Sequence, residues 1–317
     1  MLIQDNKTLC RYIPNVFTQH IPDSPTLFDK IQPYLEMAHQ WLYSLIIDDD
    51  FIKKIIDNPE PTYQQTQIKE LAISAVALKA WSLAIPALDV LITQNGVGVA
   101  ETQTIKPASK AKIDALISSV KETLDQTICR LFDSLFLYPG WSHTYNGSYY
   151  TRTLFCSCSQ AARFPDNGDK FTEDAAQKFF SHVLDMKRIQ QNIATDWISN
   201  EVMEALLLYK YRSQNINCFT MIYGKKNDPV PAHLSEQAPM IIMSVINDIQ
   251  NAIRLAMTEC GAVLDMMHSG VREAVEHAVS TIRSNQWLFR AYRGSYAEKL
   301  SRIKNFKNES NNTAYWL

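Results

Sequence analysis

The sequence predicts a mainly α-helical protein: a helical bundle with a short β-hairpin, a few additional strands and two halves of similar pattern. Three observations lead to this prediction. Apolar residues recur every three or four positions over long stretches, which is the spacing of one helix face. Glycine is scarce, at 9 of 317 residues, which disfavours strand-dense folds and glycine-rich phosphate loops. The formal net charge is −2, which argues against a dedicated nucleic-acid binder.

The chain begins with an irregular arm over residues 1–25, which carries three prolines. A helix is expected from Thr26, because apolar residues then follow on one face. Asp48-Asp49-Asp50 interrupts this pattern, and a short helix is expected over residues 51–56. The acidic triplet lacks the alternating oxygen ligands and the glycine of a calcium loop. We therefore interpret it as a solvated loop or a cluster at a helix start.

The centre of the chain predicts a helix, a short hairpin and a second helix. Thr62 with Gln65 three residues later has the pattern of a capping box. The first helix is expected to end at Asn95-Gly96, because both residues tolerate left-handed geometry. Residues 97–99 form a brief extended piece, and Ser109 is the expected N-cap of the second helix.

An aromatic stretch at 138–150 predicts a turn-rich loop. Its Trp141, Tyr145 and Tyr149 have two possible roles. Clustered Tyr and Trp side chains can anchor an interface, because they bury a large area and keep a polar tip. The same rings could instead simply cover the local core.

The second half predicts further helices and two strands. The expected strands are 151–158 and 218–223, and the expected helices are 172–193, 199–212, 235–258, 262–283 and 285–306. The helix expected over 285–306 carries more basic than acidic residues, together with an apolar stripe. Such a helix can meet an acidic partner or phosphates, or it can be a plain solvated face.

No sequence motif indicates catalysis, a metal or a cofactor. Cys156, Cys158 and His143 supply at most three soft ligands, whereas a structural zinc site usually has four. We therefore expect no cofactor and no enzyme activity, although a cytosolic enzyme that uses these three residues stays open. No stretch approaches the roughly eighteen apolar residues that cross a bilayer. The N-terminus lacks a signal-peptide core, and six cysteines suit a reducing compartment.

One resemblance is carried by the helix–hairpin–helix region. Residues 75–89, AVALKAWSLAIPALD, run into ITQNGVGV at 92–99, then KPAS at 106–109 and IDAL at 113–116. This pattern resembles a helical family of structural proteins in tailed phages and prophages of Bacteroidales, similar to head–tail connector or adaptor proteins. The resemblance is clearest over residues 1–137 and weaker over 170–258. It departs from the family in the second helix, where members tend to carry arginine and this chain has Lys110 and Lys112.

The resemblance implies a virion protein at the head–tail junction, synthesised in the bacterial host cytoplasm. It implies a ring of about twelve copies of the chain that contacts the portal and the tail or further connector proteins. Non-specific contact with DNA in the channel is possible under this reading, and no membrane is involved. A helical binding module without ring symmetry is the other open alternative.

The expected organisation is a connector-like domain over 1–137, an aromatic linker over 138–168 and a helical domain over 169–317. Residues expected at interfaces come from the hairpin, the aromatic stretch and the basic C-terminal run. They are Gly96, Val97, Gly98, Val99, Trp141, Tyr145, Tyr149, Arg290, Tyr292, Arg293, Tyr296 and Arg302.

Overall fold

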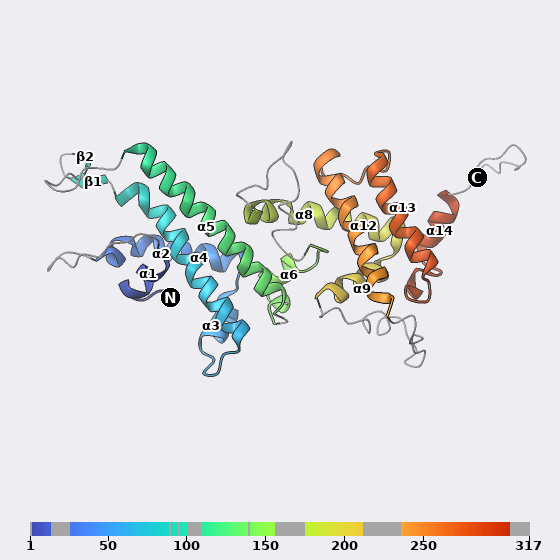
Figure 1. The fold of residues 1–317 in the computed structure, drawn as a ribbon, viewed down its shortest axis with the longest axis horizontal. Coiled ribbons are helices and arrows are strands. Elements are labelled where there is room, and N and C mark those ends of the chain that lie inside the picture. The colour runs from blue at the N-terminus through green and yellow to red at the C-terminus, as the bar shows by residue number, and fades with distance from the viewer. Residues whose placement is uncertain are drawn as a thin grey trace, which may run out of the picture. The chain divides into compact units, whose positions relative to one another are not determined.

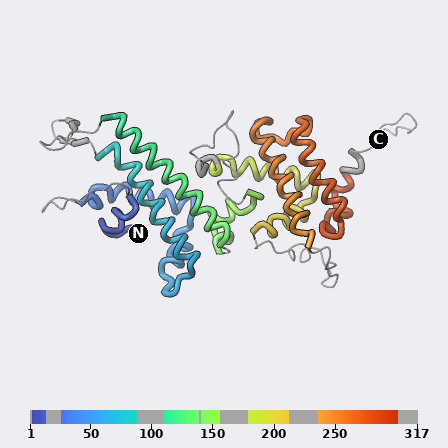
Figure 2. Tube along the Cα trace, viewed as in Figure 1, coloured from blue at the N-terminus to red at the C-terminus, as the bar shows by residue number. Residues whose placement is uncertain are grey.

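The protein is mainly α-helical and divides into two compact units (Figures 1 and 2). The first unit contains Met1–Thr151 and Phe171–Phe180, and the second contains Arg152–Cys156 and Ser181–Leu317. The aromatic stretch therefore belongs to the first unit. The structure is a computed structural model that describes residues 2–13, 26–88, 90–93, 96–99, 109–138, 140–155, 175–211 and 236–304.

The first unit is built around the long helices α4 and α5, which lie side by side in Figure 1. Helix α2 also packs against α4, and α1 and α3 make further contacts with α4. The buried side chains of α2, α4 and α5 form the core. The helices are α1 (Asn6–Tyr12), α2 (Leu27–Leu45), α3 (Asp49–Ile56), α4 (Tyr63–Leu88), α5 (Lys110–Phe136) and α6 (Tyr145–Tyr150).

Side chains at the helix starts satisfy backbone groups that a helix leaves unpaired. The capping box at Thr62 is confirmed: Gln65 N donates to Thr62 Oγ1 over 3.3 Å, and Thr62 N donates to Gln65 Oε1 over 2.9 Å. Thr26 and Asp29 form an equivalent box at the start of α2. Ser109 is the N-cap of α5, but its side chain makes no capping hydrogen bond.

Two short strands follow α4. Strands β1 (Val90–Thr93) and β2 (Gly96–Val99) pair antiparallel, with Val90 opposite Val99 and Thr93 opposite Gly96. Helix α4 therefore ends at Leu88, before the predicted Asn95-Gly96. Pro86 lies in the last turn and removes a helical N–H group, and the β-branched residues that follow favour a strand.

Helix α4 is long and apolar enough to cross a membrane by length and composition, in contrast to the expectation from sequence. Half of its most apolar 18-residue window is buried within the protein. A single helix of this kind is weak evidence for a membrane span, because the core helix of a soluble protein meets the same criterion.

The aromatic stretch is helical, so the predicted loop is wrong. It forms a 3₁₀ turn, η1 (Trp141–His143), and then α6. Three side chains of this stretch donate hydrogen bonds to main-chain carbonyls at the end of α2. Trp141 Nε1 donates to Ile46 O over 3.1 Å, Asn146 Nδ2 to Tyr43 O over 3.0 Å, and the Tyr150 hydroxyl to Leu45 O over 2.7 Å. This stretch folds because it satisfies carbonyls that the last turn of α2 leaves free.

The second unit is also helical. Residues 151–155 form turns and bends, so the predicted strand at 151–158 is wrong for these positions, and the predicted strand at 218–223 lies outside the described residues. The helices are α8 (Ala175–Ile193), the π-helical turn η2 (Ala194–Ile198), α9 (Asn200–Tyr211), α12 (Ala238–Glu259) and α13 (Ser269–Ser284).

Helices α12 and α13 pack closely and are linked by two histidine–carboxylate contacts. His277 Nδ1 lies 2.7 Å from Asp248 Oδ2, and His268 Nε2 lies 2.7 Å from Glu259 Oε2. Helix α13 begins at Ser269, so the predicted helical start at 262 is wrong. The intervening residues instead form the α12–α13 loop, residues 260–268.

The predicted continuous helix over 285–306 is also wrong. Turns lead into a 3₁₀ turn, η3 (Arg290–Tyr292), and a separate helix, α14 (Tyr296–Lys304). Gly294 between them has a φ of +80°, a left-handed geometry that suits glycine and interrupts a helix. Ser295 Oγ then accepts a hydrogen bond from Glu298 N and starts α14.

Candidate functional site: a groove in the first unit

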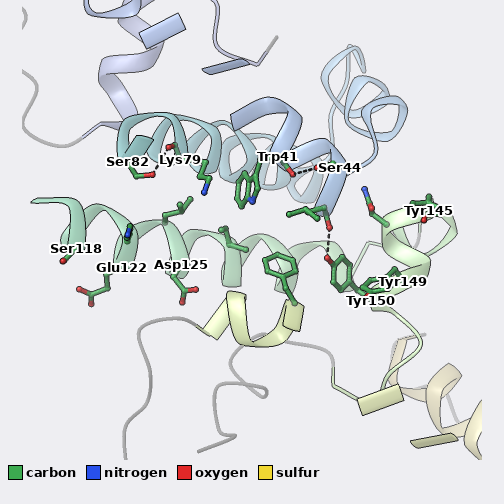
Figure 3. A pocket seen from close by; sticks show the side chains of 16 residues that line it. Trp41, Ser44, Lys79, Ser82, Ser118, Glu122, Asp125, Tyr145, Tyr149 and Tyr150 are labelled. Atoms are coloured by element: carbon green, nitrogen blue, oxygen red, sulfur yellow. Dashed lines mark hydrogen bonds between the residues drawn. The ribbon is translucent and has the colours of Figure 1, made fainter. Parts of the chain in front are cut away.

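A concave surface of about 930 Å³ opens between α2, α4, α5 and α6 of the first unit (Figure 3). We call it the first-unit groove. This volume is in the range of ordinary ligand and peptide sites. Among its lining side chains are Trp41 and Leu45 from α2, Lys79 from α4, Lys121 from α5 and Tyr149 from α6.

The groove has a cationic centre. Lys79 Nζ lies 5.3 Å from the centroid of the Trp41 ring, which is the geometry of a cation–π contact. Burial lowers the pKa of Lys79, and the positive charge of Lys121 lowers it further. No described carboxylate forms an ion pair with either lysine. The two ammonium groups therefore give this part of the groove an affinity for negative charge.

Two acidic residues of the groove lie away from Lys79. Figure 3 shows Lys79 and Trp41 between α4 and α5, whereas Glu122 and Asp125 extend from α5 away from Lys79. Lys79 and these carboxylates therefore occupy different parts of the lining, whereas Lys121 is next to Glu122 on α5. A ligand carboxylate at Lys79 would meet a cation rather than a like charge.

Apolar side chains form the rest of the lining. Leu124 and Ile128 of α5 line it together with Leu45 and Phe180. Leu45 is 43% exposed and Tyr145, at the α6 end, is 84% exposed. Apolar walls around a few charged groups are typical of a site that binds a partially apolar ligand or segment.

Two residues expected at interfaces are instead buried inside the protein. Trp141 and Tyr292 are both 0% exposed. The Trp141 ring packs edge-on against Phe132 and Phe136, and the Tyr292 hydroxyl accepts a hydrogen bond from Arg283 Nε over 3.4 Å. Their rings fill the cores of their units, which for Trp141 agrees with the interpretation as core cover, whereas Tyr292 had been expected on a partner-facing or solvated helix face.

The other expected interface residues fall in three places. Gly96, Val97, Gly98 and Val99 form strand β2. Tyr145 and Tyr149 line the first-unit groove. The last group is in the second unit, where Arg290, Arg293 and Tyr296 are exposed and Arg302 is in α14.

Sequence reasoning missed Trp41, Lys79 and Lys121. One signal for Lys79 was present, because it is the single charged residue within the apolar run 71–88 of α4. Such a charge on a core helix either reaches solvent or serves a site. Its proximity to Trp41, almost 40 positions earlier, follows only from the packing of α2 on α4.

Most of the alternative enzyme site lies outside the described residues. Cys156 and Cys158 lie outside the described residues, and His143 is an exposed residue of η1. Among the described side chains, no group of three or more His, Cys, Asp or Glu could hold a metal ion.

Comparison with known proteins gives one match. Residues 24–151 match the model of a family of unknown function, DUF6712. The match covers less than half of the chain and spans the segment from α2 to α6, which supplies the groove lining apart from Phe180. No curated protein matches, and no solved structure matches.

Proposed function

We propose that this chain is a non-enzymatic structural subunit of a phage virion, a head–tail connector of the adaptor or head-completion type. Copies pack side by side in a ring between the portal and the tail, and DNA passes through the ring. The role is mechanical, because the subunit joins two larger assemblies. The protein is made in the bacterial host cytoplasm and ends in the virion.

The observation that carries the proposal is the hairpin that follows α4. Strands β1 and β2 form a two-stranded sheet with no third strand among the described residues. The outer edge of such a sheet offers unpaired N–H and C=O groups to a strand of another chain. The same helix–hairpin–helix region carries the sequence resemblance to connector proteins.

Two further features support a role in assembly. Both units expose large apolar side chains, including Leu137 at 76% in the first and Met240 at 73% in the second. Exposed apolar side chains of this size suit contacts with neighbouring protein. The order of a long helix, a break and a shorter helix recurs in α2–α3 and α8–α9, which supports the expected similarity of the two halves.

The test is the location and oligomeric state of the native protein. Purified particles are labelled with an antibody against the chain and imaged by electron microscopy, and the purified chain is weighed by native mass spectrometry. The proposal expects label at the head–tail junction and a closed oligomer of defined mass. Absence of the chain from particles would refute it, and a strictly monomeric chain that binds particles would favour the binding module without ring symmetry.

A further inference from the structure

The α12–α13 loop of the second unit exposes apolar side chains around a carboxylate. Val263 is 58% exposed and Met267 is 87% exposed, and the exposed Asp265 lies between them in sequence. Methionine is flexible and polarisable, and it is common at protein-binding surfaces. Two exposed apolar side chains beside one negative charge are suited to a complementary protein surface.

This loop is held in a defined conformation. Arg188 Nη2 of α8 donates to Ala262 O over 3.1 Å, and Ala262 N donates to Ala256 O over 3.0 Å. Met267 N donates to Asp265 Oδ1 over 2.8 Å. Because the loop is already ordered, little conformational entropy is lost when it binds.

The first-unit groove has the complementary properties. Lys79 and Lys121 provide positive charge without an ion-pair partner among the described side chains, and Leu124, Ile128 and Phe180 provide apolar wall. A loop carrying one carboxylate and two apolar side chains therefore matches the part of the groove around Lys79 in charge and the apolar wall in polarity, while Glu122 and Asp125 line another part. The two surfaces are on different units, so copies that bind through them join head to tail. Contacts of this kind generate rings when the rotation between copies closes.

We infer that the α12–α13 loop of one copy docks in the first-unit groove of the next, with Asp265 pairing with Lys79 and Lys121. Val263 and Met267 then lie against the apolar wall. The inference deepens the proposed function, since it names one contact between neighbouring subunits of the ring and rests on that function. It is tested on the purified chain, whereas the proposed function is tested on particles.

The experiment is a charge exchange read by sedimentation velocity ultracentrifugation. One variant combines Lys79→Glu with Lys121→Glu, and the other carries Asp265→Lys. Each alone is expected to weaken self-association at least tenfold, because every contact then brings like charges together. An equimolar mixture of the two variants is expected to regain association, since each groove then meets a loop of opposite charge.

The mixture also separates contacts between copies from contacts within a chain. If docking occurred within one chain, the mixture would not restore it, and only a variant with all three substitutions would. Recovery in the triple variant without recovery in the mixture therefore overturns the inference. Wild-type chain that stays monomeric, or variants that associate as well as wild type, would also overturn it. If the chain is found at the head–tail junction in either case, the proposed function stands and only this contact fails.

Three controls address folding and general charge effects. Lys112→Glu on the exposed face of α5 and Glu276→Lys on the exposed face of α13 change charge away from both surfaces and should leave association unchanged. Asp265→Asn keeps the acceptor oxygen for Met267 N and removes only the charge, so it should weaken association while the loop stays folded. Circular dichroism and thermal unfolding confirm that each variant is folded.

Discussion

Tyr150 joins the aromatic stretch to the end of α2 through a single hydroxyl. This hydroxyl donates to the carbonyl of Leu45 over 2.7 Å, and the Tyr150 side chain is almost fully buried. Tyr150→Phe leaves that carbonyl without its donor, so we expect a loss of about 1–2 kcal/mol in the free energy of unfolding. Urea denaturation measures the loss. Tyr145→Phe, at an 84% exposed position, is the control and should stay within about 0.5 kcal/mol of wild type.

His39 makes the stability of the first unit sensitive to pH. Its Nδ1 contacts Leu35 O at 2.6 Å as a donor, and its Nε2 accepts from Leu2 N over 2.8 Å. The ring is therefore neutral, and burial lowers its pKa below the ordinary value of 6.5. The unfolded chain then binds a proton more readily than the folded chain. The stability that neutral His39 contributes is fully present above pH 6.5 and is lost as pH falls through the pKa of His39 in the folded chain.

Chemical denaturation at several pH values between 7.5 and 5 measures this effect. We expect the free energy of unfolding to fall more steeply with acid in wild type than in His39→Gln. His143→Gln, which removes an exposed histidine of the same unit, is the matched control. Equal slopes for wild type and His39→Gln would show that His39 is not the source of the pH dependence.

At the scale of single elements, α6 can form only because residue 147 is glycine. A Cβ atom at Gly147 would lie 1.8 Å from the carbonyl oxygen of Trp141, which is far inside contact distance. Gly147→Ala should therefore destabilise the protein by about 3 kcal/mol or more, as measured by thermal or urea unfolding.

Gly270 provides the matched control, because it also lies in the first turn of a helix. A Cβ there would lie 3.2 Å from a Leu255 side-chain atom, and a side chain can move. Gly270→Ala should stay within about 1 kcal/mol of wild type. Similar losses for both variants would show that the main-chain contact at Trp141 is not the cause.

Elements with a long unbroken apolar period were predictable from sequence. Helices α2, α4 and α5 follow this rule, because their stripes face one core and their caps are local. The stretch 138–150 was not predictable, because its donors bond to the end of α2, about a hundred positions earlier. The predicted helix over 285–306 was wrong although the apolar spacing there is regular, because Gly294 interrupts the helix.

At the scale of the whole molecule, the first-unit groove was beyond sequence reasoning. Its walls come from five helices, α2, α4, α5, α6 and the start of α8, and Tyr145 and Tyr149 are the lining residues that sequence reasoning had named as candidates. Their residue types made them candidate interface anchors, but sequence reasoning did not single out the lysines that give the groove its charge. Charge complementarity depends on the distance between side chains, which only packing fixes.

In the proposed connector, the hairpin after α4 is an assembly element with little expected role in folding. Replacing residues 90–99 by a glycine–serine linker of equal length removes both strands and leaves α4 and α5 intact. We expect thermal stability within about 1 kcal/mol of wild type, because the core is formed by helices. Incorporation into particles, measured by quantitative immunoblot, should fall at least tenfold. Normal incorporation would contradict a role for the hairpin in contacts between subunits.

The exposed basic residues of the second unit can face protein or DNA, and the salt dependence of binding distinguishes these two partners. Arg290 and Arg293 are exposed, and Tyr296 beside them is 65% exposed. Phosphate contacts would weaken with a log–log slope of about one for each phosphate neutralised. A packed protein neighbour would depend more on the tyrosine ring and less on salt. We expect the protein neighbour, because a DNA-facing patch does not require an exposed ring of this size.

Binding of the purified chain to duplex DNA, measured by fluorescence anisotropy between 50 and 300 mM salt, checks this prediction. We expect weak binding that Arg290→Glu with Arg293→Glu changes little, and particle incorporation that Tyr296→Ala reduces. Tyr63→Ala, which removes a similarly exposed ring from the first unit (85% exposed), is the matched control for the loss of a surface tyrosine. A steep salt dependence that the two arginine substitutions abolish would assign this surface to DNA in the channel instead.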